Sequence, residues 1–185
     1  MLVYLPDENL RIQSLIQLFN TLFQTTENTV LVAGGEEPIY LPQDAEHSFH
    51  RIIFRKDYFA SALHELAHWC IAGQRRRQMV DYGYWYQPDG RNEAEQRLFE
   101  EVEVKPQALE WILSQAAGLR FRISTDNLKG QCGDLTQFKR NVVVQAHHYL
   151  EQGLPQRASL LAQSLAIYSR REGFLRSRFF RLEAL

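Results

Sequence analysis

The chain has 185 residues, which fits one domain, and its 22 acidic and 21 basic side chains leave a formal net charge of −1. This balance argues against a protein that binds nucleic acid directly, because such proteins usually carry a strong basic excess. Apolar residues make up 45% of the chain, which excludes a disordered protein and allows a real hydrophobic core. We therefore expect a single domain over residues 1–185.

Cysteine content and the absence of long apolar runs bear on the compartment. The chain has 2 cysteines, Cys70 and Cys132, which make no disulfide framework and suit a reducing compartment. The first residues lack the basic and apolar regions of a signal peptide. No apolar run approaches the roughly 20 residues that a membrane span requires. We expect a soluble, cytoplasmic protein with no membrane partner.

The first third of the chain predicts one helix and a small sheet. Apolar residues recur at helical spacing over residues 7–24. Short apolar runs at residues 30–33 and 51–55 predict two strands. Between them, the prolines of residues 37–42 favour an extended backbone, because each proline disfavours helix at the residue before it.

The rest of the chain is mainly helical. A helix is predicted over residues 58–72 with Asp57 as its N-cap. Further helices are predicted over residues 92–117, 134–152 and 155–172, with Pro106 as a kink or boundary of the first of them. A last candidate strand covers residues 121–123. This order predicts a mainly helical α+β domain with a small sheet.

The helix at residues 58–72 contains the one motif with chemical content, His64-Glu65-Leu66-Ala67-His68. Histidines four residues apart on a helix lie one above the other, so both imidazoles can reach one metal ion. With 6 His in 185 residues, an accidental match to H-E-x-x-H is rare. The motif therefore predicts a zincin-like metal-binding helix, with Glu65 as its candidate catalytic residue. Two ordinary satisfied histidines are the plainer alternative.

A third ligand is expected from an acidic residue on the following helix. Glu103 is the first choice, because it shares a helical face with Phe99 and Pro106. Glu100 is the second choice and Glu95 the third.

The ligand set leaves three functions open. A zinc metallopeptidase would use His64, Glu65, His68 and a downstream glutamate, with Glu65 as general base. Iron(II) in the same set would keep positions open for dioxygen and support hydroxylation. A non-catalytic adaptor with a structural metal is the third, although Cys70 is expected on the opposite face of the helix.

Four stretches together resemble the elongation factor P hydroxylase family. They read EPIYLP at residues 37–42, HELAHWCIAG at 64–73, DYGYWYQPDGR at 81–91 and FEEVEVKPQAL at 99–109. The likeness is specific from about residue 37 to residue 118 and weaker to about residue 155.

The resemblance implies an oxidoreductase, a metal-dependent hydroxylase that acts on the β-lysylated lysine of elongation factor P. It implies that His64, His68 and a downstream glutamate hold the metal, and its sequence block favours Glu103 or Glu100 over Glu95. Iron(II) is the expected cofactor, with zinc as the alternative. Glu65 would then accept a hydrogen bond or tune the charge of the site.

An aromatic segment follows the motif helix, and the implied substrate gives it a use. Tyr82, Tyr84 and Trp85 could form walls for a long cationic side chain through cation–π contacts. Asp81 could pair with its amine. Ordinary core and loop packing is the alternative.

The C-terminal residues 169–185 interleave arginine with phenylalanine. We expect an amphipathic terminal helix whose arginines lie over apolar surface. Docking of a partner with an acidic surface is the second interpretation.

Overall fold

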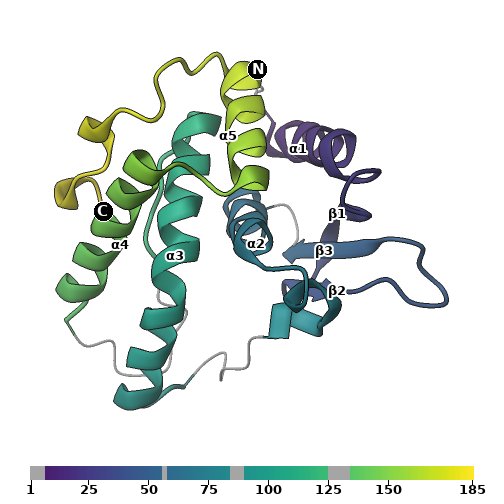
Figure 1. The fold of residues 1–185 in the computed structure, drawn as a ribbon, viewed down its shortest axis with the longest axis horizontal. Helices are drawn as coiled ribbons and strands as arrows, with labels where there is room; N and C mark the ends of the chain where they lie inside the picture. Colours follow the sequence, from purple (N-terminus) through teal and green to yellow (C-terminus); the bar gives the residue numbers. More distant parts are fainter. Residues whose placement is uncertain (1–6, 56–57, 84–89, 125–133) are drawn as a thin grey trace.

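The computed structural model of the chain describes residues 7–55, 58–83, 90–124 and 134–185. The helices are α1 (Glu8–Phe23), α2 (Phe59–Ile71), α3 (Glu93–Ala117), α4 (Thr136–Gln152) and α5 (Gln156–Ser169), and the strands are β1 (Thr29–Gly35), β2 (Ile39–Leu41) and β3 (His50–Arg55). Figure 1 shows a helical body with the small sheet at one side. The predicted mainly helical α+β class is confirmed.

The sheet has the order β1-β3-β2, with β1 parallel and β2 antiparallel to β3. Leu31 of β1 pairs with Ile52 of β3, and Ile52 also pairs with Tyr40 of β2. All three side chains are buried. α1 contacts β1, and α2 contacts β3, so the sheet is joined to the motif helix directly.

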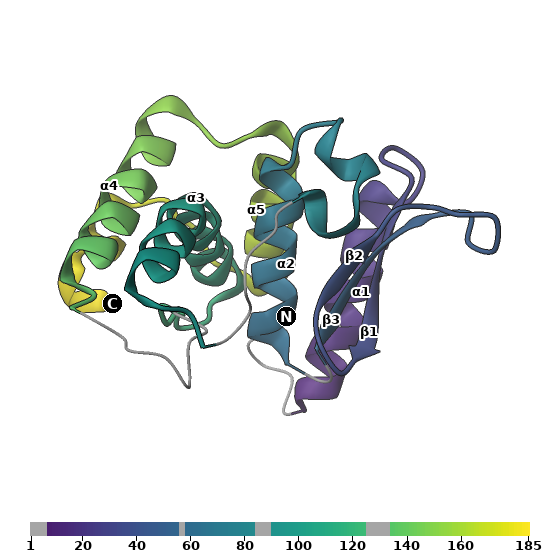
Figure 2. The same cartoon turned by 90° about the horizontal axis from the view of Figure 1, so that it is seen from below.

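Helix α2 occupies the middle of the fold. It contacts β3, α1, α3 and α5, and Figure 2 shows α2 and α5 between the sheet and α3. Eight of its residues are buried: Phe59, Ala62, Leu63, Leu66, Ala67, His68, Trp69 and Cys70. Such a helix is held by packing on several sides, which fixes the direction of the polar side chains it carries.

Helix α3 begins with a capping box between Asn92 and Glu95 and ends at Gly118, whose φ of 75° suits glycine. Pro106 lies inside the helix and does not end it, so of the two predicted alternatives, a kink or a boundary, the boundary is wrong. The side chain of Pro106 is buried, and α3 contacts α2, α4 and α5. This packing outweighs the hydrogen bond that proline removes.

Several local expectations are corrected. Residues 121–123 form no strand, and the ring of Phe121 instead stacks on Trp111 at 5.7 Å. The N-cap of α2 is Tyr58, which makes no side-chain capping bond, whereas the predicted cap, Asp57, lies outside the described residues.

The C-terminal tail also differs from its expectation. α5 ends at Ser169, and the tail makes two short 3-10 turns, Ser177–Phe179 and Leu182–Ala184, in place of an amphipathic helix. Arg170 and Gly173 both have positive φ, which prevents the helix from continuing. Among the described residues, no helix is both long enough and apolar enough to cross a membrane.

Candidate metal centre

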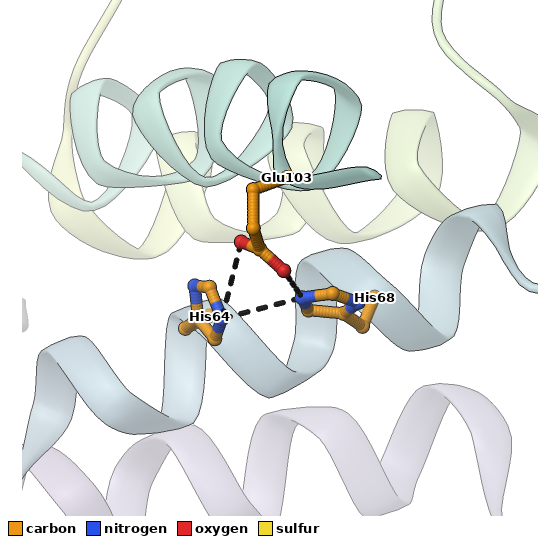
Figure 3. Close-up of side chains that lie close together, drawn as sticks. All are labelled: His64, His68 and Glu103. Carbon is orange, nitrogen blue, oxygen red and sulfur yellow. Dashed lines mark hydrogen bonds and ion pairs between the residues drawn. The ribbon is translucent and has the colours of Figure 1, made fainter. Parts of the chain in front are cut away.

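The two motif histidines leave α2 on the side that faces α3 (Figure 3). Their ring centroids are 4.8 Å apart, and the two Nε2 atoms are 3.2 Å apart. His68 is buried and His64 is partly buried. The predicted one-turn stacking of the imidazoles is confirmed, and both rings direct the same type of nitrogen to one point.

Glu103 reaches this point from α3 (Figure 3). Its carboxylate is fully buried, with Oε1 3.1 Å from Nε2 of His68 and Oε2 3.7 Å from Nε2 of His64. One ligand atom from each residue of the His64, His68 and Glu103 group lies within 4.8 Å of the others. The described residues thus contain a group of suitable size and chemistry for a metal ion.

The other two glutamates considered as third ligands are engaged elsewhere. Glu100 accepts a hydrogen bond from Gln96 at 3.2 Å. Glu95 accepts one from the backbone of Asn92 at the start of α3. Glu103 is therefore the glutamate that the fold brings to the two histidines.

One observation tests whether this group fits a cation. Oε1 of Glu103 is buried and has no hydrogen-bond partner of suitable geometry among the residues that the structure describes, although it lies 3.1 Å from Nε2 of His68. Leaving a buried carboxylate oxygen unsatisfied is costly. Two imidazole nitrogens and this oxygen form a donor set typical of zinc or iron(II), so the residues fit a divalent metal.

Glu110 is the residue that the sequence reasoning missed. Its Oε2 lies 2.9 Å from Nδ1 of His64, on the side of the ring opposite the Nε2 atom that faces His68 and Glu103. A carboxylate there accepts a hydrogen bond from Nδ1–H and would leave the lone pair of Nε2 free to bind a metal ion. The signal was available, since Glu110 follows Glu103 by two helical turns and so shares its face of α3.

Gln107 holds Glu103 from the next turn of α3. Its side-chain amide lies 3.4 Å from Oε2 of Glu103 and donates to the carbonyl of Ser124 at 2.7 Å. The amide of Ser124 donates in return to Oε1 of Gln107 at 3.1 Å. The segment after α3 is therefore tied to the glutamate at the centre of the site.

The charges of the group are strongly coupled. Burial alone would lower the pKa of His64, but the carboxylates of Glu103 and Glu110 hold it well above its ordinary value. Burial alone would raise the pKa of Glu103, but His68 and His64 lower it to about 2. Burial raises the pKa of Glu110, while its bond to His64 opposes this effect. Glu103 is thus an ionised carboxylate and candidate ligand in an environment that largely excludes solvent.

Glu65 lies on α2 between the two histidines and is partly buried. Burial raises its pKa, the two imidazoles oppose this rise, and the charges of Glu103 and Asp81 add to it. The charges of the candidate centre therefore act on Glu65, although Glu65 is not part of the group His64, His68 and Glu103.

The residues predicted to bind substrate are only partly described. Asp81 is exposed and accepts a hydrogen bond from the backbone of Tyr40 at 3.0 Å. Tyr82 lies in the short helix Val80–Gly83, and its side chain is outside the described structure. Tyr84 and Trp85 lie outside the described residues.

Arg157 of α5 secures the C-terminal end of α2. It donates to the carbonyls of Trp69 at 3.0 Å, Cys70 at 3.2 Å and Ala72. Its guanidinium also lies 4.8 Å from the ring centroid of Trp69. The last carbonyls of a helix have no hydrogen-bond partner within the helix. The side chain of Arg157 supplies hydrogen bonds to these carbonyls at the end of α2, directly after His68.

Comparison with known proteins agrees with this site. The family model described as "Elongation factor P hydroxylase" matches residues 18–179. A protein of Haemophilus influenzae named "Elongation factor P lysine hydroxylase" is 52% identical to the chain over 160 residues, which covers 86% of this chain and 90% of the relative. All residues of the His64, His68 and Glu103 group lie within the matched region.

Proposed function

The chain belongs to the elongation factor P hydroxylase family, and from this premise we propose that it hydroxylates the β-lysylated lysine of elongation factor P with a divalent metal held by His64, His68 and Glu103. The observation that carries the metal role is the convergence of these three donors from α2 and α3 within 4.8 Å. The substrate follows from the family and from the name of the relative.

We propose iron(II) as the metal, because hydroxylation needs a redox-active ion with positions left open for dioxygen. A set of two histidines and one carboxylate leaves such positions. Zinc suits the same donors and would support hydrolysis instead. When bound, iron(II) supplies the activation of dioxygen, and the protein supplies the binding site and its surroundings.

Residues around the three candidate ligands position them and shield them from water. Glu110 orients His64 by accepting a hydrogen bond from Nδ1–H, and the side-chain amide of Gln107 lies beside the carboxylate of Glu103. Burial of Glu103 and His68 keeps bulk water away from these donors and strengthens each charge interaction. Arg157 fixes the end of α2 one turn beyond His68.

We assign Glu65 a role beside the metal, as an acid–base group or hydrogen-bond acceptor rather than as a ligand. It belongs to the same helix as both histidines, and its pKa responds to burial, to their charges and to that of Asp81. Asp81 is therefore within electrostatic range of the site. We propose that Asp81 and the aromatic side chains of Tyr82, Tyr84 and Trp85 receive the cationic lysine derivative.

Mass spectrometry of elongation factor P tests the function. In cells without this protein, the β-lysylated peptide should be lighter by one oxygen atom than the peptide from wild-type cells. Re-expression of the wild-type protein should restore the oxygen, and the His68→Ala variant should not. A factor that stays fully hydroxylated in the deletion strain would refute the proposal.

A further inference from the structure

The tail that follows α5, residues 170–185, displays a concentration of positive charge. Five of its side chains are exposed arginines: Arg170, Arg171, Arg176, Arg178 and Arg181. Among the described residues, none of these guanidinium groups pairs with a carboxylate. The acidic residues of the tail are Glu172 and Glu183. A protein with a net charge of −1 thus carries a local basic surface at its C-terminus.

The tail is held firmly against the helical body. Phe180 is fully buried and meets Trp111 of α3 edge-on at 5.0 Å. Its carbonyl lies 2.9 Å from Nε2 of His147, and the carbonyl of Leu185 accepts a hydrogen bond from Lys139 at 3.3 Å. Figure 1 shows the tail running from the end of α5 back to α4. The arginines are therefore presented from a fixed backbone rather than from a free terminus.

A pocket lies among these arginines. It has a volume of about 280 Å³, and its walls are Gln115, Arg170, Arg171, Glu172, Phe174 and Phe179. The guanidinium of Arg178 lies 5.1 Å from the ring centroid of Phe179. Arginine and aromatic side chains are enriched at protein–protein interfaces relative to the rest of the surface, and arginine binds carboxylates through two parallel hydrogen bonds.

This surface is separate from the metal centre. Gln115, in the wall of the pocket, and Glu103 both lie on α3. At about 1.5 Å of rise per residue, the two are about 18 Å apart along the helix axis. A small substrate at the metal could not touch both places, whereas a protein substrate could.

We propose that the tail is a docking surface for an acidic face of elongation factor P, which binds there while its modified lysine reaches the metal centre. The inference rests on the proposed function. Unpaired arginines at the rim of an interface act chiefly by steering the partner, which raises the association rate at low salt. The near-neutral charge of the whole chain favours a protein partner over a nucleic acid, which would require a broader basic excess.

The test measures, by stopped-flow, how fast the purified protein associates with intact β-lysylated elongation factor P at low and at high salt. The double variant Arg171→Ala/Arg178→Ala should lower the association rate about tenfold at low salt and reduce its salt dependence. In turnover assays it should raise KM about tenfold and leave kcat nearly unchanged. The double variant Arg171→Lys/Arg178→Lys should keep most of the association rate, because it keeps the charge.

The matched control is Arg55→Ala/Arg75→Ala, which removes two exposed arginines elsewhere on the molecule. It should associate like the wild type. Equal association rates for the tail variant and the control would overturn the inference. A second measurement compares the binding of single-stranded RNA by the wild type and the tail variant. If the tail variant lost RNA binding but kept its association rate with elongation factor P, the inference would also be overturned. Absence of hydroxylated product from the wild-type protein would instead refute the proposed function, so the two failures are distinguishable.

Discussion

Nδ1 of His64 lies 2.9 Å from Oε2 of Glu110, while Nε2 of the same ring faces His68 and Glu103. One imidazole therefore links a buried carboxylate behind the site to the donors in front of it. Because both glutamates come from α3 and both histidines come from α2, the candidate metal centre depends on how these two helices pack.

Glu110→Gln should weaken metal binding about 10- to 100-fold, because the amide orients His64 less firmly and makes its ring less basic. Isothermal titration of the metal-free protein with iron(II) under anaerobic conditions measures this change. Glu101→Gln is the matched control, since Glu101 is an exposed residue of the same helix. Equal affinity for both variants would show that Glu110 does not position the ligand.

Glu65→Gln separates a hydroxylase from a peptidase. The variant should keep its metal, because Glu65 is outside the three-residue group, and it should retain part of the hydroxylation of elongation factor P. A zinc peptidase would lose nearly all turnover with this change, since Glu65 would be its general base. Wild-type protein that cleaves peptides in a manner dependent on Glu65 would support the peptidase instead.

Arg157→Ala should lower the free energy of unfolding by about 2–4 kcal/mol, because it leaves carbonyls at the end of α2 without their charged donor. Urea unfolding followed by circular dichroism measures the loss. Arg97→Ala removes an exposed arginine that pairs with Glu93 on the surface of α3 and should cost less than about 1 kcal/mol. If both variants lost equal stability, the role given to Arg157 would be wrong.

Cys70 should be unreactive in the folded protein. It is buried, and burial raises the pKa of its thiol to about 12, so thiolate is scarce at neutral pH. Alkylation followed by peptide mass spectrometry should label Cys70 only after denaturation. Rapid labelling of the native protein would mean that the α2 face opposite the histidines is open to solvent.

The helix that carries the two candidate metal ligands, His64 and His68, could be predicted from the sequence because it depends on local spacing. Four residues along a helix determine that His64 and His68 lie together. Glu103 could be ranked first because Phe99 and Pro106 share its face, and all three are buried. The shared helical face was the informative signal, because Val102, the apolar residue next to Glu103 in the sequence, is exposed.

The remaining features depend on contacts between distant segments. Glu110 shares a helical face with Glu103 in the sequence, but its contact with His64 depends on how α3 packs on α2. The tail was predicted as a helix from its alternating arginines and phenylalanines, but insertion of Phe180 beside Trp111 decides its course. Likewise, α3 packs on three other helices, and this packing allows the helix to continue past Pro106.

Metal analysis of protein purified without oxygen tests the central claim most directly, with His68→Ala and Glu103→Gln beside the wild type. The account predicts one tightly bound divalent metal per wild-type chain and a large loss of metal in both variants, with the fold preserved by circular dichroism. Metal content that stayed equal in all three folded proteins would contradict it.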